Sequence, residues 1–328
     1  MGSGRWAIAI HGGAGSIERG RLKPEQEQAY REALGQALAA GTTVLDQGGA
    51  ALDAVEAAIH VLEDDPLFNA GRGAAFTAQG RNEHDASIMD GRGLRAGAVA
   101  GVTRTRHPIS LARAVMENSP FVFLVGRGAQ AFGESQGMEQ AEPGFFFTER
   151  RWRSLENVLR ASGQTIPERP EGVLETQPAK AALVHDEGKQ GTVGVVALDR
   201  HGDVAAGTST GGTTAKRFGR VGDSPIIGAG TYASNASCAV SATGAGEYFI
   251  RLTVARDIAA LVELKGMSLQ AAADEVVQNK LTALGGDGGV IAVAPDGQIA
   301  WSFNTSGMYR ARAAEGQPAQ VGIYKDEP

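Results

Sequence analysis

The stretch Gly191-Thr192-Val193-Gly194-Val195-Val196-Ala197-Leu198-Asp199 decides the organisation of this chain of 328 residues. A threonine follows a glycine and opens an apolar, β-branched run, which predicts a buried strand. Residues 161–190, just before it, have the composition of turns and loops. This order suits a chain that is cut between Gly191 and Thr192, which leaves Thr192 as a new N-terminal residue. A free α-amine on the same residue can activate the weakly nucleophilic threonine hydroxyl.

A second interpretation of Thr192 stays open at this point. Any Gly-Thr-Val sequence is compatible with an ordinary strand that begins after a loop. The first interpretation makes the chain a self-cleaving hydrolase with Thr192 as its reaction centre, and the second gives Thr192 no chemistry. The rest of the chain has to decide between them.

Composition excludes several classes of protein. The formal net charge is −6, so no basic footprint predicts a nucleic-acid partner. No run of about 18 apolar residues is present, so no membrane span is expected. Residues 1–6 lack an apolar signal core, which favours the cytoplasm. The single cysteine, Cys238, rules out an intrachain disulfide and a cysteine-based zinc cluster.

Glycine is unusually frequent, at 46 residues, which is about twice the average usage of roughly 7%. The glycines cluster in short loops between apolar runs, among them Gly12-Gly13 and Gly211-Gly212. Glycine lets a ligand approach the main chain closely. These loops predict a site built largely from backbone groups.

Hydrophobic periodicity predicts a mixture of helices and strands. In the first half we expect helices over residues 24–40, 51–62, 110–116 and 149–161, and strands over 6–10, 74–77 and 97–103. In the second half we expect helices over 244–264 and 268–281, and strands over 192–199, 204–209, 226–232, 236–241, 289–294, 299–303 and 320–324. Helices segregated from a largely antiparallel sheet indicate an α+β fold.

Two further threonines accompany Thr192. Thr210 directly follows an expected strand, and Thr243 directly precedes the longest expected helix, where it is a suitable N-cap. Amides at a helix N-terminus stabilise an oxyanion or a carboxylate. Capping alone would also explain Thr243, so its sequence position leaves both roles open.

A charged pair lies in the turn Gly219-Arg220-Val221-Gly222-Asp223-Ser224-Pro225. Arg220 and Asp223 could bind the α-carboxylate and the α-ammonium group of an amino acid. A surface ion pair in a loop is the alternative explanation.

The segment 62–73 compresses acidic residues, a proline and small residues into one irregular turn. Its backbone carbonyls could enclose a monovalent cation, or it could be a plain structural loop. Within it, Asn69 could orient a hydroxyl or an oxyanion, or it could be a turn asparagine.

Two other patterns carry little weight. Gly207-Thr208-Ser209-Thr210-Gly211 matches the nucleophile elbow G-x-S-x-G, but the residues that follow are a poor helix start, so we reject this motif. Asp85 and Asp90 are expected to be turn and cap residues rather than paired catalytic acids.

Taken together, the motifs form a recognisable series. The series is Ile10-His11-Gly12-Gly13-Ala14-Gly15, Pro66-Leu67-Phe68-Asn69-Ala70-Gly71, Gly191-Thr192-Val193-Gly194, Ser209-Thr210-Gly211-Gly212, the Arg220–Asp223 turn and Ala242-Thr243-Gly244-Ala245-Gly246-Glu247. In this order they resemble the plant-type L-asparaginases, also called isoaspartyl aminopeptidases, among the N-terminal nucleophile hydrolases. The resemblance covers about residues 6–324.

The resemblance implies a four-layer αββα sandwich formed by one domain over residues 1–328. It implies autocatalytic cleavage between Gly191 and Thr192, with residues 1–191 as the α subunit and 192–328 as the β subunit. Residues 162–191 would be a flexible linker or tail. The cleaved subunits stay associated, and the family usually pairs two αβ units into an (αβ)2 dimer.

The resemblance also implies catalytic roles. Thr192 is the nucleophile and its α-amine the base, and Thr210 hydrogen-bonds the nucleophile. Thr243 and Gly244 match the oxyanion hole. Asn69 matches a residue that assists hydroxyl positioning or cleavage.

For substrate binding, Arg220 and Asp223 match the clamp for the α-carboxylate and the α-amine. Gly212, Thr243 and Gly246 belong to the same substrate-binding set. The implied substrates are L-asparagine and β-aspartyl dipeptides, with no catalytic cofactor.

The same resemblance implies a sodium-binding loop. Its main-chain carbonyl ligands would come from Leu62, Glu63, Asp65, Phe68, Ala70 and Arg72.

The chain departs from the family at three positions. Thr213 and Ala215 stand where many relatives have Met and Asn, and Phe218 stands where a smaller aliphatic residue is common. These residues border the clamp, so the preference between asparagine and β-aspartyl peptides stays open.

Three alternatives remain. A glycosylasparaginase would have Asp-Thr at the cut, which Gly191 disfavours. A threonine endopeptidase of the taspase type would take a large protein substrate. A protein that never matures would bind an amino acid without turnover.

Overall fold

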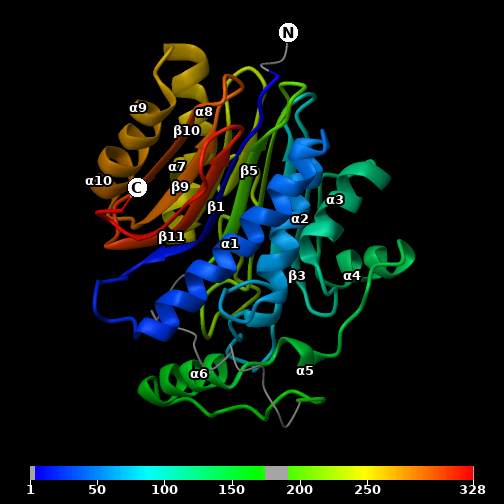
Figure 1. The fold of residues 1–328 in the computed structure, drawn as a ribbon. Coiled ribbons are helices and arrows are strands. Elements are labelled where there is room, and N and C mark those ends of the chain that lie inside the picture. Colours follow the sequence, from blue (N-terminus) through cyan, green and yellow to red (C-terminus); the bar gives the residue numbers. More distant parts are fainter. Residues whose placement is uncertain (1–3, 174–190, 328) are drawn as a thin grey trace.

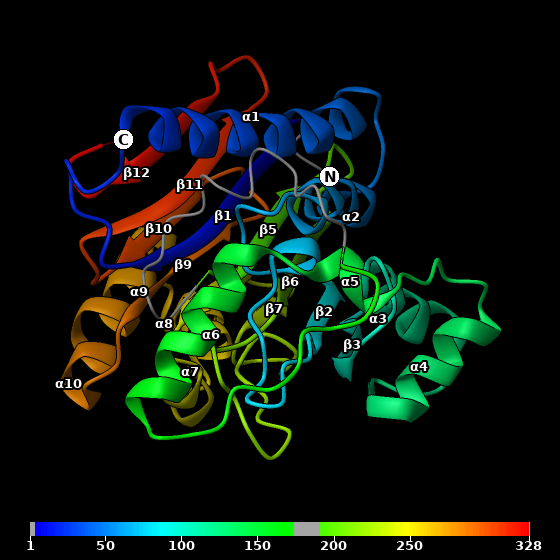
Figure 2. The same ribbon diagram turned by 90° about the horizontal axis from the view of Figure 1, so that it is seen from below.

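Two β-sheets lie face to face, with helices on their outer faces (Figures 1 and 2). The computed structural model describes residues 4–173 and 191–327. The order of the eight-stranded sheet is β12 (Gln320–Tyr324), β11 (Gly307–Ala314), β1 (Ala7–Gly15), β5 (Val193–Leu198), β6 (Val204–Thr210), β2 (His84–Asp90), β3 (Arg95–Val102) and β4 (Phe123–Val125). The order of the four-stranded sheet is β10 (Ile299–Phe303), β9 (Gly288–Val293), β8 (Ala239–Gly244) and β7 (Thr231–Ala233). The large sheet is mixed, because β3 and β4 pair in parallel.

Figure 1 shows one group of helices on each outer side of the sheet pair. The large sheet is covered by α1 (Pro24–Asp46), α2 (Ala51–Asp64) and α3 (Pro108–Asn118). The small sheet is covered by α7 (Gly246–Leu252), α8 (Val254–Lys265), α9 (Leu269–Asp274) and the π-helical segment η3 (Glu275–Leu281), which α10 (Thr282–Leu284) follows. The remaining helices are η1 (Gly71–Gly73), α4 (Gly126–Ser135), α5 (Pro143–Phe146) and α6 (Glu149–Ala161). No helix in these described segments is long and apolar enough to cross a membrane.

Three apolar layers hold this arrangement together. Strand β5 illustrates why, because its alternate side chains enter different layers. Val195 packs in the cluster between the large sheet and its helices, and Val196 packs in the cluster between the two sheets. A third cluster, which includes Val240 and Ile258, lies between the small sheet and its helices. A strand buried on both faces needs a continuous apolar run, which explains the sequence 193–198. The expected α+β class is confirmed.

Several expected elements differ in the structure. No strand covers residues 74–77, where only isolated bridges at Phe76 and Thr77 form. The expected helix 244–264 is two helices, because Thr253 takes a left-handed conformation with φ 49°. The expected cap role of Thr243 is wrong, since Thr243 lies inside β8 and the N-cap of α7 is Ala245.

Strands β2 and β11 were not expected. Asp85 is therefore no turn residue: it lies inside the buried strand β2, and its carboxylate accepts the main-chain N–H of Gly101 at 2.9 Å. Asp90 ends that strand and accepts the N–H of Arg92 at 3.0 Å, as a turn residue does.

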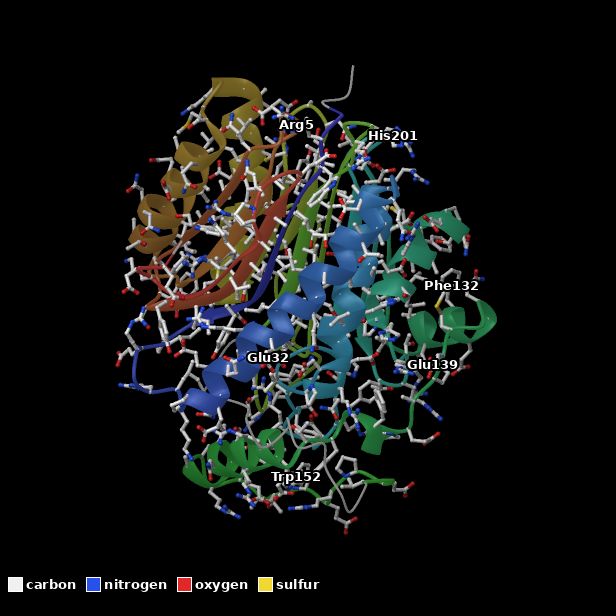
Figure 3. The ribbon with its side chains drawn as sticks, in the orientation of Figure 1. Arg5, Glu32, Phe132, Glu139, Trp152 and His201 are labelled. Atoms are coloured by element: carbon white, nitrogen blue, oxygen red, sulfur yellow. The ribbon has the colours of Figure 1, made fainter. Side chains whose placement is uncertain are left out.

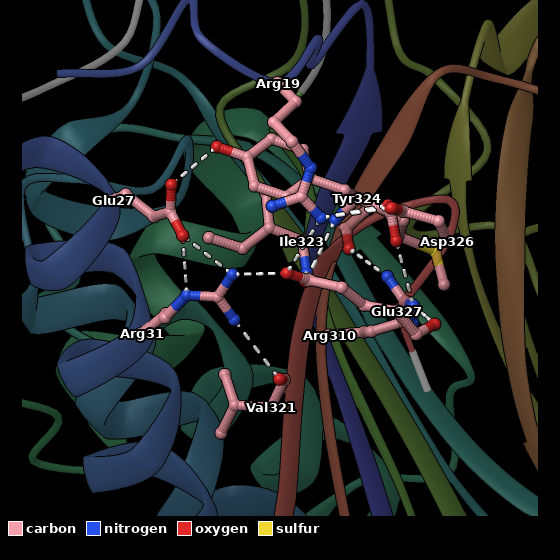
Figure 4. A network of polar contacts seen from close by, with 10 residues as sticks. Arg19, Glu27, Arg31, Arg310, Val321, Ile323, Tyr324, Asp326 and Glu327 are labelled. Atoms are coloured by element: carbon pink, nitrogen blue, oxygen red, sulfur yellow. Dashed lines mark hydrogen bonds and ion pairs between the residues drawn. The ribbon is translucent and has the colours of Figure 1, made fainter. Parts of the chain in front are cut away.

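A polar network ties the C-terminal end to the first helix (Figure 4). Arg31 of α1 donates to Glu327 at 2.7 Å and to Glu27 at 2.8 Å. The Tyr324 hydroxyl of β12 donates to the other oxygen of Glu27 at 2.7 Å. Nearby, the largely buried Arg310 donates to the Tyr324 carbonyl at 3.1 Å, and burial lowers the pKa of Arg310 to about 10. These bonds fix the edge of the large sheet against α1.

Replacement of Trp152, labelled in Figure 3, tests the small apolar cluster under α6. Trp152 is 1% exposed and meets the Phe76 ring edge-on at 5.2 Å. Trp152→Ala is expected to lower the free energy of unfolding by about 3–5 kcal/mol, because the cavity left behind cannot collapse fully. Urea unfolding measures the change. The control Val158→Ala removes a 42% exposed side chain from the same helix and should change stability by less than about 0.5 kcal/mol. Equal effects of the two changes would contradict this account.

Candidate active site

Thr192 lies immediately before the central strand β5, where its hydroxyl meets a second hydroxyl. The Thr192 Oγ1 atom donates to Thr210 Oγ1 at 3.0 Å, and Thr210 ends the neighbouring strand β6. Thr210 Oγ1 also accepts the main-chain N–H of Gly212 at 3.0 Å. Pairing of β5 with β6 fixes this contact, since Val193 is opposite Ser209. The two threonines that the sequence selected are therefore in direct contact.

Asn69 holds the peptide bond that precedes Thr192. Its main-chain N–H donates to the carbonyl oxygen of Gly191 at 3.1 Å. Its side-chain Nδ2 donates to the Gly212 carbonyl at 2.7 Å, and its Oδ1 accepts the N–H of Ala75 at 2.7 Å. Asn69 is thus a buried junction between three loops rather than a turn asparagine alone.

His11 is a site residue to which sequence analysis gave no role. Its Nδ1 lies 3.0 Å from the carbonyl oxygen of Thr192, and its Nε2 lies 3.0 Å from Ser241 Oγ. The side chain is fully buried, and this burial lowers the pKa of His11 to about 3. His11 is consequently neutral at physiological pH. A histidine that interrupts an apolar strand before two glycines is the signal that could have found it.

A small pocket opens beside the two threonines. Six of the predicted site residues line it: Thr192, Thr210, Gly212, Arg220, Asp223 and Gly244. Thr213, Gly222 and Ser224 complete the lining. The structure therefore brings the predicted nucleophile and the predicted clamp together, although Arg220 and Thr192 are 28 residues apart in sequence.

Asp223 supplies a buried carboxyl group to this pocket. It is 3% exposed, and within the described residues its Oδ2 atom has no hydrogen-bond partner. Burial raises the pKa of Asp223 to about 7, although the nearby Arg220 opposes this shift. Gly246 leaves room for the carboxyl group, because a Cβ there would lie 2.9 Å from Asp223 Oδ1. A buried carboxyl group with a free oxygen suits a cationic ligand.

Arg220 is paired with Glu247 rather than with Asp223, the acid of the alternative ion pair. Its Nε and Nη2 atoms donate to the two carboxylate oxygens of Glu247 at 2.9 and 3.1 Å. A surface pair between Arg220 and Asp223 is therefore not what the turn forms. The hydrogen bond from Arg220 lowers the pKa of Glu247, whose side chain is 60% exposed. Glu247 belongs to the motif that carries Thr243 and Gly244, but its position in that motif does not predict this contact.

Thr243 lies beside the pocket but not in its lining. Its side chain is completely buried, and its Oγ1 atom has no hydrogen-bond partner among the described residues. The next residue, Gly244, lines the pocket with backbone atoms. A buried hydroxyl without a protein partner is a candidate group for binding a ligand.

The main chain packs closely in the loop after α2. Gly71 has φ +48°, and a Cβ there would overlap the carbonyl oxygen of Glu63. A Cβ at Gly73 would overlap the carbonyl oxygen of Phe68. Both positions therefore require glycine. Within the described segments, no cluster of three or more His, Cys, Asp or Glu side chains could hold a metal ion.

The rejected nucleophile elbow is also absent from the structure in this region. Ser209 lies inside strand β6, and a loop follows that strand. The Ser209 hydroxyl donates to the buried Glu63 carboxylate at 2.6 Å, which also accepts the N–H of Ile109 at 3.2 Å. Burial raises the pKa of Glu63. This contact joins the end of α2 to the strand that carries Thr210.

Known proteins match this chain over nearly its whole length. A family model described as asparaginase covers residues 4–323. An isoaspartyl peptidase of Salmonella typhimurium is 50% identical over 319 residues, which are 97% of this chain and 98% of the relative. An isoaspartyl peptidase of Escherichia coli is 49% identical over 324 residues, 99% of this chain and 98% of the relative. A plant-type L-asparaginase of Pyrococcus abyssi is 42% identical over 311 residues, 94% of this chain and 97% of the relative.

The protein is thus of the α+β class, and its candidate active site, which contains Thr192, lies at the start of a central strand. The chain belongs to the asparaginase family whose members include isoaspartyl peptidases and plant-type L-asparaginases. The resemblance stated from the motifs is confirmed.

The raised pKa of Asp223 predicts a pH-dependent change in stability. Its value of about 7 exceeds the ordinary 3.8, so the folded chain retains a proton that the unfolded chain releases. The carboxyl group therefore destabilises the fold increasingly as the pH rises from about 4 to about 7. Asp223→Asn should unfold at a higher temperature than the unchanged chain at pH 8 and at about the same temperature at pH 4. Thermal unfolding at both pH values checks this, and a difference independent of pH would contradict it.

Proposed function

We propose that this chain is a self-processing amidohydrolase that cleaves β-aspartyl dipeptides and the side-chain amide of L-asparagine. One observation carries the proposal. The Thr192 hydroxyl, bonded to Thr210 at 3.0 Å, borders a pocket that also holds a guanidinium group and a buried carboxyl group. Isoaspartyl peptidase and L-asparaginase names among the relatives support this substrate class.

Processing between Gly191 and Thr192 is the first step that we propose. Thr192 Oγ attacks the Gly191 carbonyl carbon, the C–N bond breaks, and water hydrolyses the resulting ester. The Asn69 N–H, which donates to the Gly191 carbonyl oxygen at 3.1 Å, is positioned to stabilise negative charge on that oxygen. The products are an α subunit of residues 1–191 and a β subunit of residues 192–328. The tail predicted over 162–191 lies partly outside the described residues.

Turnover then uses the α-amine released on Thr192 as the base. Thr192 Oγ attacks the side-chain carbonyl carbon of the substrate, and the developing oxyanion binds at Thr243 and Gly244. The C–N bond breaks, the leaving amine takes the proton, and water hydrolyses the β-aspartyl ester. Thr192 Oγ1 donates to Thr210 Oγ1 before the attack. Once the α-amine has taken the proton of Thr192, the Thr210 hydroxyl can donate its own proton to Thr192 Oγ1, while it continues to accept the Gly212 N–H.

Recognition depends on the charged ends of the substrate. Asp223 offers to the α-ammonium group an oxygen that has no partner among the described residues, and Gly246 leaves space beside this carboxyl group. Gly212 lines the same pocket. Arg220 binds the α-carboxylate of the substrate. This carboxylate must either share the guanidinium group with Glu247 or displace Glu247 from it. Losing a buried charged partner costs far more than trimming a methylene, so this clamp sets specificity.

Sodium binding in the loop after α2 is part of the proposal. The carbonyls of Asp65 and Ala70 each accept one hydrogen bond within the loop, which leaves their second lone pairs for a ligand. The cation would fix the loop that carries Asn69. The proposed carbonyl ligands are those of Leu62, Glu63, Asp65, Phe68, Ala70 and Arg72.

The assembly, the compartment and the substrate preference complete the proposal. We propose an (αβ)2 dimer of cleaved units in the cytoplasm. Of the three family departures, Thr213 lines the pocket, whereas Phe218 is fully exposed. Thr213 is therefore the residue through which we expect the preference between asparagine and β-aspartyl peptides to be set.

Replacement of the nucleophile tests processing and turnover together. Thr192→Ala should remain a single species of 34.0 kDa and hydrolyse neither substrate, because the hydroxyl is lost. Denaturing intact mass and amide hydrolysis measure both effects. The matched change Thr192→Ser retains a hydroxyl and should still be cut. A cut, active Thr192→Ala protein would refute the assignment of the nucleophile.

Replacement of Arg220 separates recognition from processing. Arg220→Ala should raise KM for L-asparagine by roughly 10- to 100-fold, the value of a charge-assisted hydrogen bond of about 1.5–3 kcal/mol. Processing should continue, because Asn69 rather than Arg220 donates to the Gly191 carbonyl. Arg217→Ala removes an exposed arginine of the same loop and should leave KM unchanged. A variant that fails to mature, or an unchanged KM, would count against this division of roles.

A further inference from the structure

We propose that His11 is a positioning residue that fixes the main chain of Thr192 at the end of a directed chain of buried hydrogen bonds. This inference rests on the proposed function and deepens it. Nucleophile and base lie on one residue, so whatever orients that residue orients both. The Thr210 contact holds only the side chain, and the His11 contact to the Thr192 carbonyl supplies a second anchor.

The chain of hydrogen bonds runs between the two sheets. Thr231 Oγ1 of β7 donates to Thr208 Oγ1 of β6 at 2.6 Å. Thr208 Oγ1 lies 2.7 Å from Ser241 Oγ of β8. Ser241 Oγ lies 3.0 Å from His11 Nε2, and His11 Nδ1 lies 3.0 Å from the Thr192 carbonyl oxygen. Thr231, Thr208, Ser241 and His11 are all completely buried.

The chemistry of the last contact sets the direction of the whole chain. A carbonyl oxygen can only accept, so His11 Nδ1 must carry the proton. The imidazole is neutral, because burial lowers the pKa of His11 to about 3. Its Nε2 is then an acceptor, and Ser241 must donate to it. Thr208 in turn donates to Ser241 at 2.7 Å in preference to the Gly230 carbonyl at 3.1 Å, and it accepts from Thr231. Ser241 likewise has a second acceptor, the Gly207 carbonyl at 3.2 Å, which is farther away than His11 Nε2 at 3.0 Å.

Strand β5 is shaped to admit this chain. Gly194 is opposite His11 in the pairing of β1 with β5. A Cβ at Gly194 would overlap both Ser241 Oγ and His11 Nε2. The glycine that interrupts the apolar run of β5 therefore leaves space for the contact between His11 and Ser241.

This arrangement extends the logic of a catalytic triad, in which a third group orients the base. Here the base would be the α-amine of Thr192. Because this amine is a main-chain group, it can be oriented only through the backbone of Thr192. A hydrogen bond to the carbonyl of the same residue restricts rotation of its backbone. The amine and Oγ then keep one geometry relative to the pocket after the Gly191 bond is cut.

The tautomer of His11 is the first measurement. In protein labelled with 15N in its histidine rings, His11 should show a protonated Nδ1 and an unprotonated Nε2, unchanged between pH 5 and pH 8. Assignment uses the loss of its signals in His11→Asn. A protonated Nε2, or titration in this range, would overturn the directed chain whether or not the protein hydrolyses any amide.

Two amide variants separate the roles of the ring nitrogens. Asn places an N–H near the position of Nδ1, and Gln places one near Nε2. His11→Asn should retain most of kcat, whereas His11→Gln and His11→Leu should lose about tenfold or more, as expected for a displaced reacting group. KM should change by less than about threefold in all three. Rates are expressed per matured protein, with the cut fraction taken from intact mass.

If a variant matures slowly, the half-time of processing is a second readout. Processing should be faster in His11→Asn than in His11→Gln and His11→Leu. Ser241→Ala should lower kcat partially, since Nε2 loses its donor. Ser302→Ala is the matched control: it removes a buried hydroxyl from the same small sheet, where Ser302 donates to Asp274 at 2.7 Å. Rescue by Gln rather than Asn, or equal effects of Ser241→Ala and Ser302→Ala, would overturn the proposal. Absence of all processing and hydrolysis in the unchanged chain would instead refute the proposed function.

Discussion

Strand β5 lies between β1 and β6 in the middle of the large sheet, and the position of Thr192 depends on this double pairing. Backbone hydrogen bonds to both neighbours leave the start of the strand little freedom. The same pairings bring Thr210 to one side of Thr192 and His11 to the other. A site at the end of such a strand inherits the rigidity of the sheet, which is the condition for holding reacting groups in a fixed geometry.

The groups around Thr192 are not arranged for maximum stability. Asp223 is buried with an unpartnered oxygen, and the buried Thr243 hydroxyl has no partner in the described segments. A buried polar group without a hydrogen-bond partner in the protein lowers the stability of the fold. The apolar layers on both faces of the two sheets offset that cost. Unsatisfied polar groups in a well-packed frame are typical of sites that gain their missing partners from a ligand.

The sequence predicted the elements whose pattern is local. Helix α6 was predicted with its observed bounds, and the apolar strand β5 was predicted to within one residue at each end. Both predictions succeeded because amphipathic and β-branched patterns indicate by themselves which side chains are buried. Strands β2 and β11 were missed because each carries buried polar residues. Ser87 in β2 donates to the carbonyl of Ser224, and Arg310 in β11 donates to the carbonyl of Tyr324, both of which are distant in sequence. The contact of Arg220 with Glu247 and that of His11 with Thr192 are equally non-local, so spacing alone could not reveal them.

The order of strands in the large sheet has a consequence for the molecularity of folding. Strand β1, from before residue 192, lies between β11 and β5, which come after it, and β5 and β6 lie between β1 and β2. The two pieces of a cut chain are thus interleaved and separate only when the sheet itself comes apart. The uncut chain refolds as one molecule, at a rate independent of its concentration. A chain cut as proposed would have to refold from two molecules, so its midpoint of unfolding would rise with protein concentration. In dilute solution the two pieces would re-associate slowly, so the time for which the cut protein stays folded would be set by its rate of unfolding.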